Sequence, residues 1–284
     1  ANLQEQEGQP LVNHAGAETL PPGSIFKIIT TAAGLNNGFN PSSTLTGSNV
    51  ITLPDTVTEL TNYANQKCNG QDAVTLQTAF ALSCNTAFVE MSEQLGADEL
   101  RKYAKAFGVG ENYDLGVSTS AGTLGDLPDG AATAQSAIGQ RDVTMTALQA
   151  AVMAGTVANK GTRMQPYLVN RITDAQMKDI RTTKPKKADQ AVNEETAATL
   201  TDLMYASERS SAGYDGNGFA SKTGTAEHGE GLAPHVWYVA FDPERDIAVG
   251  VVVKNGGNLG ESATGGKVSG PIGRAILRAY QGEQ

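Results

Sequence analysis

The hydrophobic positions of this chain recur every three to four residues through its first two thirds and form strand-like runs in its last third. The clearest helical stripe follows the turn Pro22-Gly23 and ends before Asn36-Asn37-Gly38. Its apolar members are Ile25, Ile28, Ile29, Ala32 and Ala33. This spacing predicts a helix from Ser24 to about Leu35 that packs in a core, with Ser24, Lys27 and Thr31 on another face.

Further helices are predicted in the middle of the chain, each from a polar cap followed by apolar residues at helical spacing. They cover 76–82, a segment with Phe88, Met91 and Leu95 on one face, 98–107, 147–158 and 194–204. Their caps include Thr75, Asp98, Thr146 and Asn193. The stretch 111–137 is rich in Gly, Ser and Thr, so we expect a loop there.

Three strands are predicted in the last third, over 219–225, 235–241 and 247–254. The turn 242–246 joins the second and third, which should form an antiparallel hairpin. Short strands are also expected at 50–53 and 167–169. A final helix, with Ile272, Ala275, Ile276, Ala279 and Tyr280 on its apolar face, is expected to cover the sheet. The pattern predicts an α/β fold, an antiparallel sheet flanked by helices, with an all-α subdomain inserted.

Length and charge narrow the possible classes of protein. A chain of 284 residues is long enough for one large domain or two packed lobes that share a core. Its net charge of -9 argues against nucleic acid as a partner, because phosphate binding needs basic patches. The one basic cluster, Lys184-Pro185-Lys186-Lys187, is expected to be a solvated loop. No apolar run approaches the ~18 residues of a membrane span.

The chain has two cysteines, Cys68 and Cys84. In a reducing compartment they would be inert buried thiols. In an oxidising compartment a bond between them would close a loop worth about 3 kcal/mol. The residues alone leave both interpretations open.

Three groups of polar residues are candidates for chemistry. Ser24 and Lys27 are neighbours on one helix, and a lysine whose charge is disfavoured by burial or nearby cations can deprotonate a serine. The helix N-terminus also favours negative charge at the reacting centre. A Ser-x-x-Lys spacing, however, arises by chance in most chains of this length.

The second group is Ser83-Cys84-Asn85 at a helix break, where Asn85 could equally be an ordinary helix cap. The third is Lys222-Thr223-Gly224-Thr225 on a strand. A cation and hydroxyls beside a glycine can hold a substrate carboxylate, although an edge strand with a solvated lysine has the same pattern. Each group alone is a weak signal.

Together, Ser-x-x-Lys, Ser-x-Asn and Lys-Thr-Gly in this order form the signature of serine β-lactamases and penicillin-binding proteins. The surrounding segments Pro22–Lys27, Gly139-Gln140, Thr146–Gln149, Lys222–Glu227 and Trp237–Phe241 resemble a class B penicillin-binding protein, a monofunctional peptidoglycan D,D-transpeptidase. The resemblance extends from about Leu20 to Leu277. Motif spacing and the cysteine between Ser83 and Asn85 are most similar to the actinobacterial penicillin-binding protein A group.

The resemblance implies a penicillin-binding/serine β-lactamase-like fold and a role for each motif. Ser24 would be the nucleophile, Lys27 its base and Ser83 a proton relay, while Asn85 would bind Lys27 and the donor amide. Lys222, Thr223, Gly224 and Thr225 would hold the substrate carboxylate, and the N–H groups of Ser24 and Thr225 would form the oxyanion hole. The implied reaction cross-links peptidoglycan stem peptides that end in D-Ala-D-Ala, and β-lactams would trap Ser24.

The resemblance also implies a location and partners. Class B proteins act at the extracytoplasmic face of the cell membrane, held by an N-terminal anchor and a pedestal domain, together with proteins of cell division and wall synthesis. Neither the anchor nor the pedestal is in this sequence, so residues 1–284 are expected to be one soluble transpeptidase domain, with 1–16 as a remnant of an upstream region. An extracytoplasmic site implies a Cys68–Cys84 disulfide that ties down the Ser83 loop.

Other members of this superfamily remain alternatives: a D,D-carboxypeptidase, a β-lactamase, or a non-catalytic β-lactam sensor. The chain has neither the Glu-x-x-Leu-Asn segment of class A β-lactamases nor the Tyr-Gly-Asn of class D. The three histidines His14, His228 and His235 lack metal-ligand spacing, so no metal or cofactor is expected.

Overall fold

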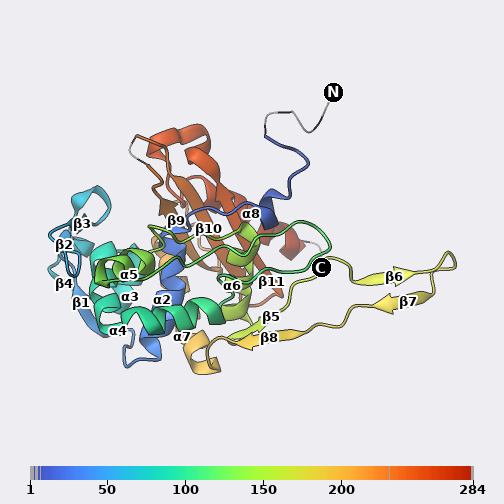
Figure 1. Ribbon diagram of the computed structural model, residues 1–284, viewed down its shortest axis with the longest axis horizontal. Helices are drawn as coiled ribbons and strands as arrows, with labels where there is room; N and C mark the ends of the chain where they lie inside the picture. The colour runs from blue at the N-terminus through green and yellow to red at the C-terminus, as the bar shows by residue number, and fades with distance from the viewer. Residues whose placement is uncertain (1–2, 4–5, 7, 230, 283–284) are drawn as a thin grey trace.

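The computed structural model describes residues 3, 6, 8–229 and 231–282. Its largest sheet has three antiparallel strands in the order β11-β10-β9: β9 (Ala220–Ala226), β10 (His235–Asp242) and β11 (Ile247–Val253). The predicted strands and hairpin are thereby confirmed. Figure 1 shows this sheet, in orange and red, on one side of the molecule and most of the helices on the other.

The predicted central helix is present, but its first turn is tighter than expected. Gly23–Phe26 forms a 3₁₀ turn, and α2 (Lys27–Leu35) continues from it. Every residue from Lys27 to Gly34 is buried. The core around α2 contains apolar side chains of α3 (Leu76–Leu82), α4 (Asn85–Ala106) and α7 (Glu194–Ser210). A helix buried on all sides leaves its polar groups dependent on partners from neighbouring elements.

The middle of the chain is more helical than the sequence predicted. The separate helix expected to start at Asp98 is the second half of α4, which runs through a non-helical Gly96. The expected loop 111–137 ends in helix α5 (Gly130–Ala137), whose N-cap is Asp129. Its small side chains lack an obvious apolar stripe, although Asp129 carries the expected cap signal.

The remaining helices start at the capping residues that were predicted from the sequence. Thr75 caps α3, and Thr146 forms a capping box at the start of α6 (Ala147–Ala158). Asn193 caps α7, which runs six residues beyond the predicted end at Met204 and finishes at Ser210.

The final helix α8 (Ser269–Gly282) packs on the sheet through a face other than the predicted one. Ile272 and Ile276 are 45% and 44% exposed, whereas Gly273, Arg274 and Leu277 are buried. Gly273 lies so close to Tyr238 on β10 that a Cβ atom would be 2.3 Å from its ring. Arg274 can face inward because Glu208 pairs with it, which the aliphatic pattern could not reveal.

Four two-stranded sheets complete the fold: β1–β4, β2–β3, β5–β8 and β6–β7. The strands are β1 (Thr44–Thr46), β2 (Val50–Thr52), β3 (Glu59–Thr61), β4 (Ala73–Thr75), β5 (Thr162–Met164), β6 (Arg171–Thr173), β7 (Asp179–Thr182) and β8 (Lys187–Gln190). The strand expected at 167–169 is irregular chain between β5 and β6. The hairpin β6–β7 projects far from the body as an arm (Figure 1), and its strand residues are mostly exposed.

The segment 1–16 is partly described. Residues 1, 2, 4, 5 and 7 lie outside the described residues. The short helix α1 (His14–Ala17) is held to the body, because the backbone N–H of Ser120 donates to Gly16 and the Ser120 hydroxyl donates to Ala17. In the described part of the chain, no helix combines the length and hydropathy needed to span a membrane.

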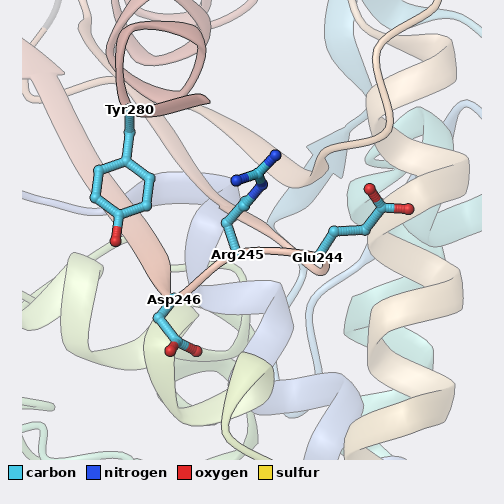
Figure 2. Close-up of a pocket in the computed structure, with 4 residues that line it drawn as sticks. All are labelled: Glu244, Arg245, Asp246 and Tyr280. Carbon is cyan, nitrogen blue, oxygen red and sulfur yellow. The ribbon is translucent and has the colours of Figure 1, made fainter. Parts of the chain in front are cut away.

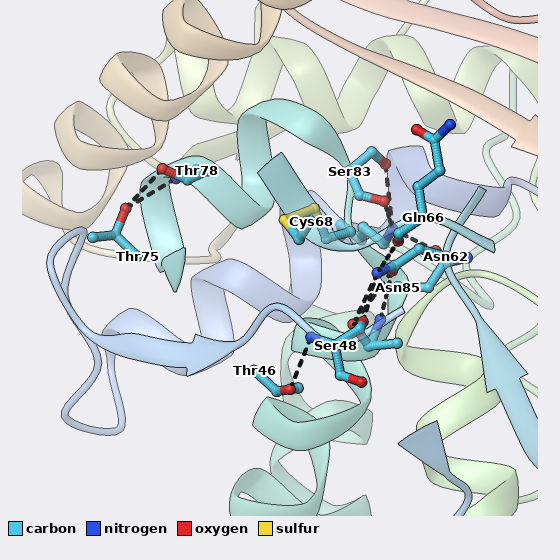
Figure 3. Close-up of a disulfide and its surroundings, with 12 residues drawn as sticks. Thr46, Ser48, Asn62, Gln66, Cys68, Thr75, Thr78, Ser83 and Asn85 are labelled. Carbon is cyan, nitrogen blue, oxygen red and sulfur yellow. Dashed lines mark hydrogen bonds between the residues drawn. A yellow bond between two sulfur atoms is a disulfide. The ribbon is translucent and has the colours of Figure 1, made fainter. Parts of the chain in front are cut away.

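The predicted disulfide between Cys68 and Cys84 is present. Figure 3 shows it beside Ser83 and Asn85. The two cysteines are 16 residues apart, so the bond ties the chain before β4 to the break between α3 and α4. It restricts a loop that would otherwise be free in the unfolded chain.

Replacing both cysteines, as Cys68→Ser/Cys84→Ser, should lower the free energy of unfolding by about 3 kcal/mol, since the unfolded chain regains the entropy of the open loop. Urea titration measures this difference. Because the chain has only these two cysteines, a reductant should destabilise the unaltered protein and leave the double variant unchanged. A double variant as stable as the parent would contradict the expectation.

Candidate active site

The turn that carries Ser24 is held on three sides by backbone and side-chain contacts. The Gly23 N–H donates to the carbonyl of Gly139 at 2.9 Å, and the Trp237 indole donates to the carbonyl of Pro21 at 2.8 Å. Leu20 forms an antiparallel bridge with Met145. These contacts fix the path of the chain into the nucleophile turn before the helix begins.

Two glycines allow the nucleophile turn to approach strand β9. Gly23 has a φ of +53°, and a Cβ atom there would be 2.8 Å from the carbonyl oxygen of Thr225. Gly224 faces the turn from the strand, where a Cβ atom would be 2.8 Å from the carbonyl oxygen of Pro22. A larger residue at either position would separate the backbone of the Ser24 turn from that of the Lys222–Thr225 segment.

The second motif lies where α3 ends and α4 begins. Ser83 has the left-handed conformation, with a φ of 61°, and Asn85 is the first residue of α4. Asn62 supports this break by accepting a hydrogen bond from the backbone N–H of Thr86 at 3.1 Å. Figure 3 shows the resulting cluster of polar side chains next to the disulfide. The break therefore has a defined shape that directs Ser83 and Asn85 toward α2.

Lys27 meets the second motif directly. Its ammonium nitrogen donates to the Asn85 side-chain oxygen at 2.7 Å and to Ser83 twice, at 2.8 Å to the carbonyl and 3.2 Å to the hydroxyl. Lys222 reaches the same Ser83 hydroxyl at 3.0 Å from strand β9. The structure thus joins Lys27, Ser83, Asn85 and Lys222 in one hydrogen-bonded group.

Both lysines are completely buried, and burial penalises their charged forms. Burial lowers the pKa of Lys222 to about 7. Burial, together with the positive charge of Lys222, holds the pKa of Lys27 well below its usual range. A lysine in this state can lose its proton near neutral pH and act as a base.

Two aromatic rings lie under the lysines and were not singled out from the sequence. The Lys27 nitrogen is 5.2 Å from the centre of the Phe88 ring, and the Lys222 nitrogen is 5.7 Å from that of Phe80. Aromatic faces attract cations within about 6 Å. Both phenylalanines belong to the hydrophobic core, so an apolar pattern alone could not tell this contact from ordinary core packing.

Of the remaining predicted residues, Thr223 bonds to this group, because its backbone carbonyl accepts a hydrogen bond from the Lys222 amine at 3.0 Å. Ser24, Gly224 and Thr225 lie within three residues of one of the two lysines. Ser24 lies one turn before Lys27 and is half-buried. Thr223 and Thr225 are half-buried on β9. Gly224, which lies between them, allows the nucleophile turn to pack closely against this strand. Gly139 and Trp237 belong to segments that carried the resemblance, but their contacts with the nucleophile turn were not predicted from the sequence.

The three histidines do not join this group. His228 and His235 stack with ring centres 3.9 Å apart, and burial is the main reason that the pKa of His235 falls to about 4. His14 bonds to Glu18. No cluster of three or more metal-ligating side chains occurs among the described residues.

A surface pocket of about 410 Å³ lies at the turn between β10 and β11. Figure 2 shows its lining residues Glu244, Arg245, Asp246 and Tyr280. None of the candidate catalytic residues takes part in it. The convergence of two lysines on one hydroxyl, rather than this pocket, therefore identifies the candidate site.

The family model of the penicillin binding protein transpeptidase domain matches residues 1–278. The chain belongs to this family. The resemblance seen in the three motifs is thereby confirmed over nearly the whole sequence.

Individual relatives agree with this assignment. The peptidoglycan D,D-transpeptidase PbpA of Mycolicibacterium smegmatis is 45% identical over 98% of this chain and 58% of its own length. PbpA of Mycobacterium tuberculosis is 42% identical over 99% of this chain and 59% of its own length. The chain thus spans less than two thirds of these curated relatives.

Solved structures confirm the predicted penicillin-binding fold. The penicillin G acyl-enzyme complex of M. tuberculosis penicillin-binding protein A superposes with a TM-score of 0.92, at 42% identity, and covers 98% of this chain and 65% of that chain. The D,D-transpeptidase domain of a peptidoglycan glycosyltransferase from Eggerthella lenta has a TM-score of 0.82 at 25% identity, covering 96% and 69%.

The buried lysines of this transpeptidase domain should make its stability depend on pH. An unfolded lysine keeps its proton up to about pH 10.4, whereas folded Lys222 loses it near pH 7. Between these values the unfolded chain binds more protons, so the free energy of unfolding should rise with pH. Urea titrations at about pH 7, 8 and 9 test this expectation below the range in which tyrosines titrate.

The matched variant Lys222→Met should show a smaller rise, because it removes one buried amine and the charge that acts on Lys27. Equal slopes for the variant and the parent would contradict the expectation.

Proposed function

We propose that this chain is the catalytic domain of a serine D,D-transpeptidase that cross-links peptidoglycan stem peptides through a Ser24 acyl-enzyme. The observation that carries the proposal is the convergence of Lys27 and Lys222 on the Ser83 hydroxyl. Lys27 lies one helical turn after Ser24. Two buried amines on one hydroxyl form a path along which a proton can move.

In the acylation step, the Ser24 hydroxyl oxygen attacks the carbonyl carbon between the last two D-alanines of a stem peptide. Lys27, in its neutral form, takes the Ser24 proton. The backbone N–H groups of Ser24 and Thr225 stabilise the oxyanion, each donor contributing roughly 2.7–4 kcal/mol. The close packing of Gly23 against Thr225 supports this pairing.

Collapse of the tetrahedral intermediate breaks the peptide bond. Ser83 passes its proton to the leaving nitrogen and takes up in turn the proton held by Lys27, to which it is hydrogen-bonded, and D-alanine departs. An amine from a neighbouring stem peptide then attacks the acyl carbon and gives a proton to neutral Lys27, which returns it to the Ser24 oxygen as the ester bond breaks. Asn85 orients Lys27 and the donor amide, while Lys222, Thr223, Gly224 and Thr225 hold the terminal carboxylate. The bond from Lys27 to Asn85 supports the first of these roles.

The chemistry predicts the ligands and the location. β-Lactams resemble the D-Ala-D-Ala end and acylate the same serine; the M. tuberculosis protein is described as a penicillin G acyl-enzyme. We infer that the native protein acts at the extracytoplasmic face of the membrane, among proteins of cell division and wall synthesis. The disulfide fits an oxidising compartment.

The domain organisation follows from the same reasoning. We infer that residues 1–284 make up one transpeptidase domain, in which the helical subdomain carries Ser83 and Asn85 and the sheet carries Lys222. The nucleophile lies between them on α2 and its 3₁₀ turn. This division explains why the three motifs are far apart in the sequence but close in space.

A fluorescent penicillin should label the protein covalently on Ser24, because the acyl-enzyme lacks an efficient hydrolytic step. The label, followed by gel fluorescence and intact mass, should persist for many minutes to hours. Ser24→Ala should remove it. Release within seconds would instead indicate a β-lactamase, and a label that survives Ser24→Ala would contradict the assigned nucleophile. D-Alanine release and cross-linking, measured with a stem-peptide donor and an amine acceptor, separate a transpeptidase from a carboxypeptidase or a sensor.

Lys27→Ala should lower the rate constant of penicillin acylation by about 10²–10⁴, the usual contribution of a general base. In the unaltered protein the rate should fall as pH is lowered through the pKa of Lys27, since a protonated amine cannot accept the Ser24 proton. Stopped-flow or quench measurements across pH test both statements. The control Lys102→Ala removes an exposed lysine of α4 and should leave the rate unchanged. A Lys27→Ala protein with normal acylation would exclude this base.

A further inference from the structure

A second group of charged and polar side chains lies behind strand β9, on the side away from Ser83. Its centre is Glu208 of α7, which is 1% exposed. The carboxylate accepts hydrogen bonds from Arg274 at 2.6 Å, from Asn217 at 2.9 Å and from the Tyr238 hydroxyl at 3.0 Å. It also accepts one from the Ser221 hydroxyl. Four protein donors surround the carboxylate, which can therefore stay ionised although it is buried.

These donors come from different parts of the fold. Arg274 is on α8, Tyr238 on β10 and Ser221 on β9, while Asn217 lies in the segment between α7 and β9. One carboxylate therefore joins two helices, two strands and the approach to β9. Burial alone would raise the pKa of Glu208, but the bonds from Arg274, Ser221 and Asn217 outweigh it and lower that pKa.

Ser221 is the only direct link from this carboxylate to β9 among the described contacts, and it precedes Lys222. Consecutive residues of a strand point to opposite faces. Ser221 accordingly bonds to Glu208 behind the strand, while Lys222 bonds to Ser83 in front of it. Strand β9 is also an edge strand, since it pairs only with β10 in the described sheet.

We propose that Glu208 and its donors Ser221 and Tyr238 form a positioning cluster. This cluster fixes the position of β9 relative to α7 so that the Lys222 amine reaches the Ser83 hydroxyl. The inference rests on the proposed transpeptidase function and adds to it residues that do not touch substrate. Lys222 has a 3.0 Å bond to Ser83, so a strand displaced by about 1 Å would lose this contact, and misplacements of that size can cost 10²-fold in rate.

Glu208 itself is a poor target for the test, because removing its charge would leave Arg274 buried without its partner, which is strongly destabilising. Smaller changes keep the ion pair. Ser221→Ala removes the link to β9, and Tyr238→Phe removes the link to β10, each at the cost of one hydrogen bond.

The chain contains a matched control for Tyr238→Phe. Tyr113 is also buried, at 1% exposure, and its hydroxyl accepts a hydrogen bond from buried Arg163 at 3.2 Å. Arg163 pairs with Glu111, so this second cluster also combines a buried tyrosine with an arginine–carboxylate pair, although here the hydroxyl bonds to the arginine and not to the carboxylate. It lies between the loop after α4 and strand β5, and none of its contacts reaches β9.

The experiment measures penicillin G acylation of the unaltered protein, Ser221→Ala, Tyr238→Phe and Tyr113→Phe at a temperature at which all four are folded by circular dichroism. We expect about a tenfold lower second-order acylation rate constant for Ser221→Ala and a smaller loss for Tyr238→Phe, within the range that misplacement causes. Tyr113→Phe should lose thermal stability like Tyr238→Phe but keep the parental rate.

A pH series adds a readout that stability alone would not move. In Ser221→Ala the pH at which Lys222 loses its proton should rise from about 7, because a displaced Lys222 is more solvated. Parental rates and parental pH profiles in folded Ser221→Ala and Tyr238→Phe would overturn the positioning role. Equal rate losses in Tyr113→Phe would also overturn it. Failure of the unaltered protein to be acylated would instead refute the proposed function.

Discussion

The structure depends on keeping two amines buried beside one hydroxyl. Lys27 and Lys222 are both fully buried, and each bonds to Ser83. Burying a charged amine costs several kcal/mol unless its environment compensates, and no carboxylate bonds to either lysine in the described chain. The cost of burying these charges is compensated only in part. Carbonyl and amide oxygens accept hydrogen bonds on one side, and aromatic faces attract the positive charges on the other. An arrangement of this kind keeps a lysine near the balance between its charged and neutral forms.

This requirement explains much of the surrounding architecture. The disulfide and Asn62 hold the Ser83 break, and Gly23 and Gly224 let two backbones approach each other. Trp237 and Gly139 hold the nucleophile turn. Each of these devices restricts backbone movement near a charged group. Without them the site could relax, admit water and let both lysines return to their ordinary protonated state.

Some of these elements could be predicted from the sequence and others could not. Strands β9 to β11 and the starts of α3, α6 and α7 follow from apolar runs and from single capping residues, which are local signals. Helix α5 was missed because its small side chains lack periodicity, and α8 was assigned the wrong buried face because Arg274 is buried by a partner 66 residues away. The candidate site residues were predicted from three short motifs, whereas the contacts of Phe80, Phe88 and Glu208 were not. Their roles depend on which charges face them in space, and that information is absent from local spacing.

The arm β6–β7 gives the molecule an uneven distribution of charge. Residues 168–187 contain six basic and two acidic residues, in a chain whose net charge is -9. Arg171, Lys178 and Arg181 lie in the hairpin that projects from the body (Figure 1). The other three basic residues follow it toward and into β8, and the rest of the molecule is correspondingly more negative. The protein therefore has an electric dipole whose positive end lies along this arm and its base. In the field of a negatively charged surface it experiences a torque that turns the arm toward that surface, and salt weakens this torque over the Debye length.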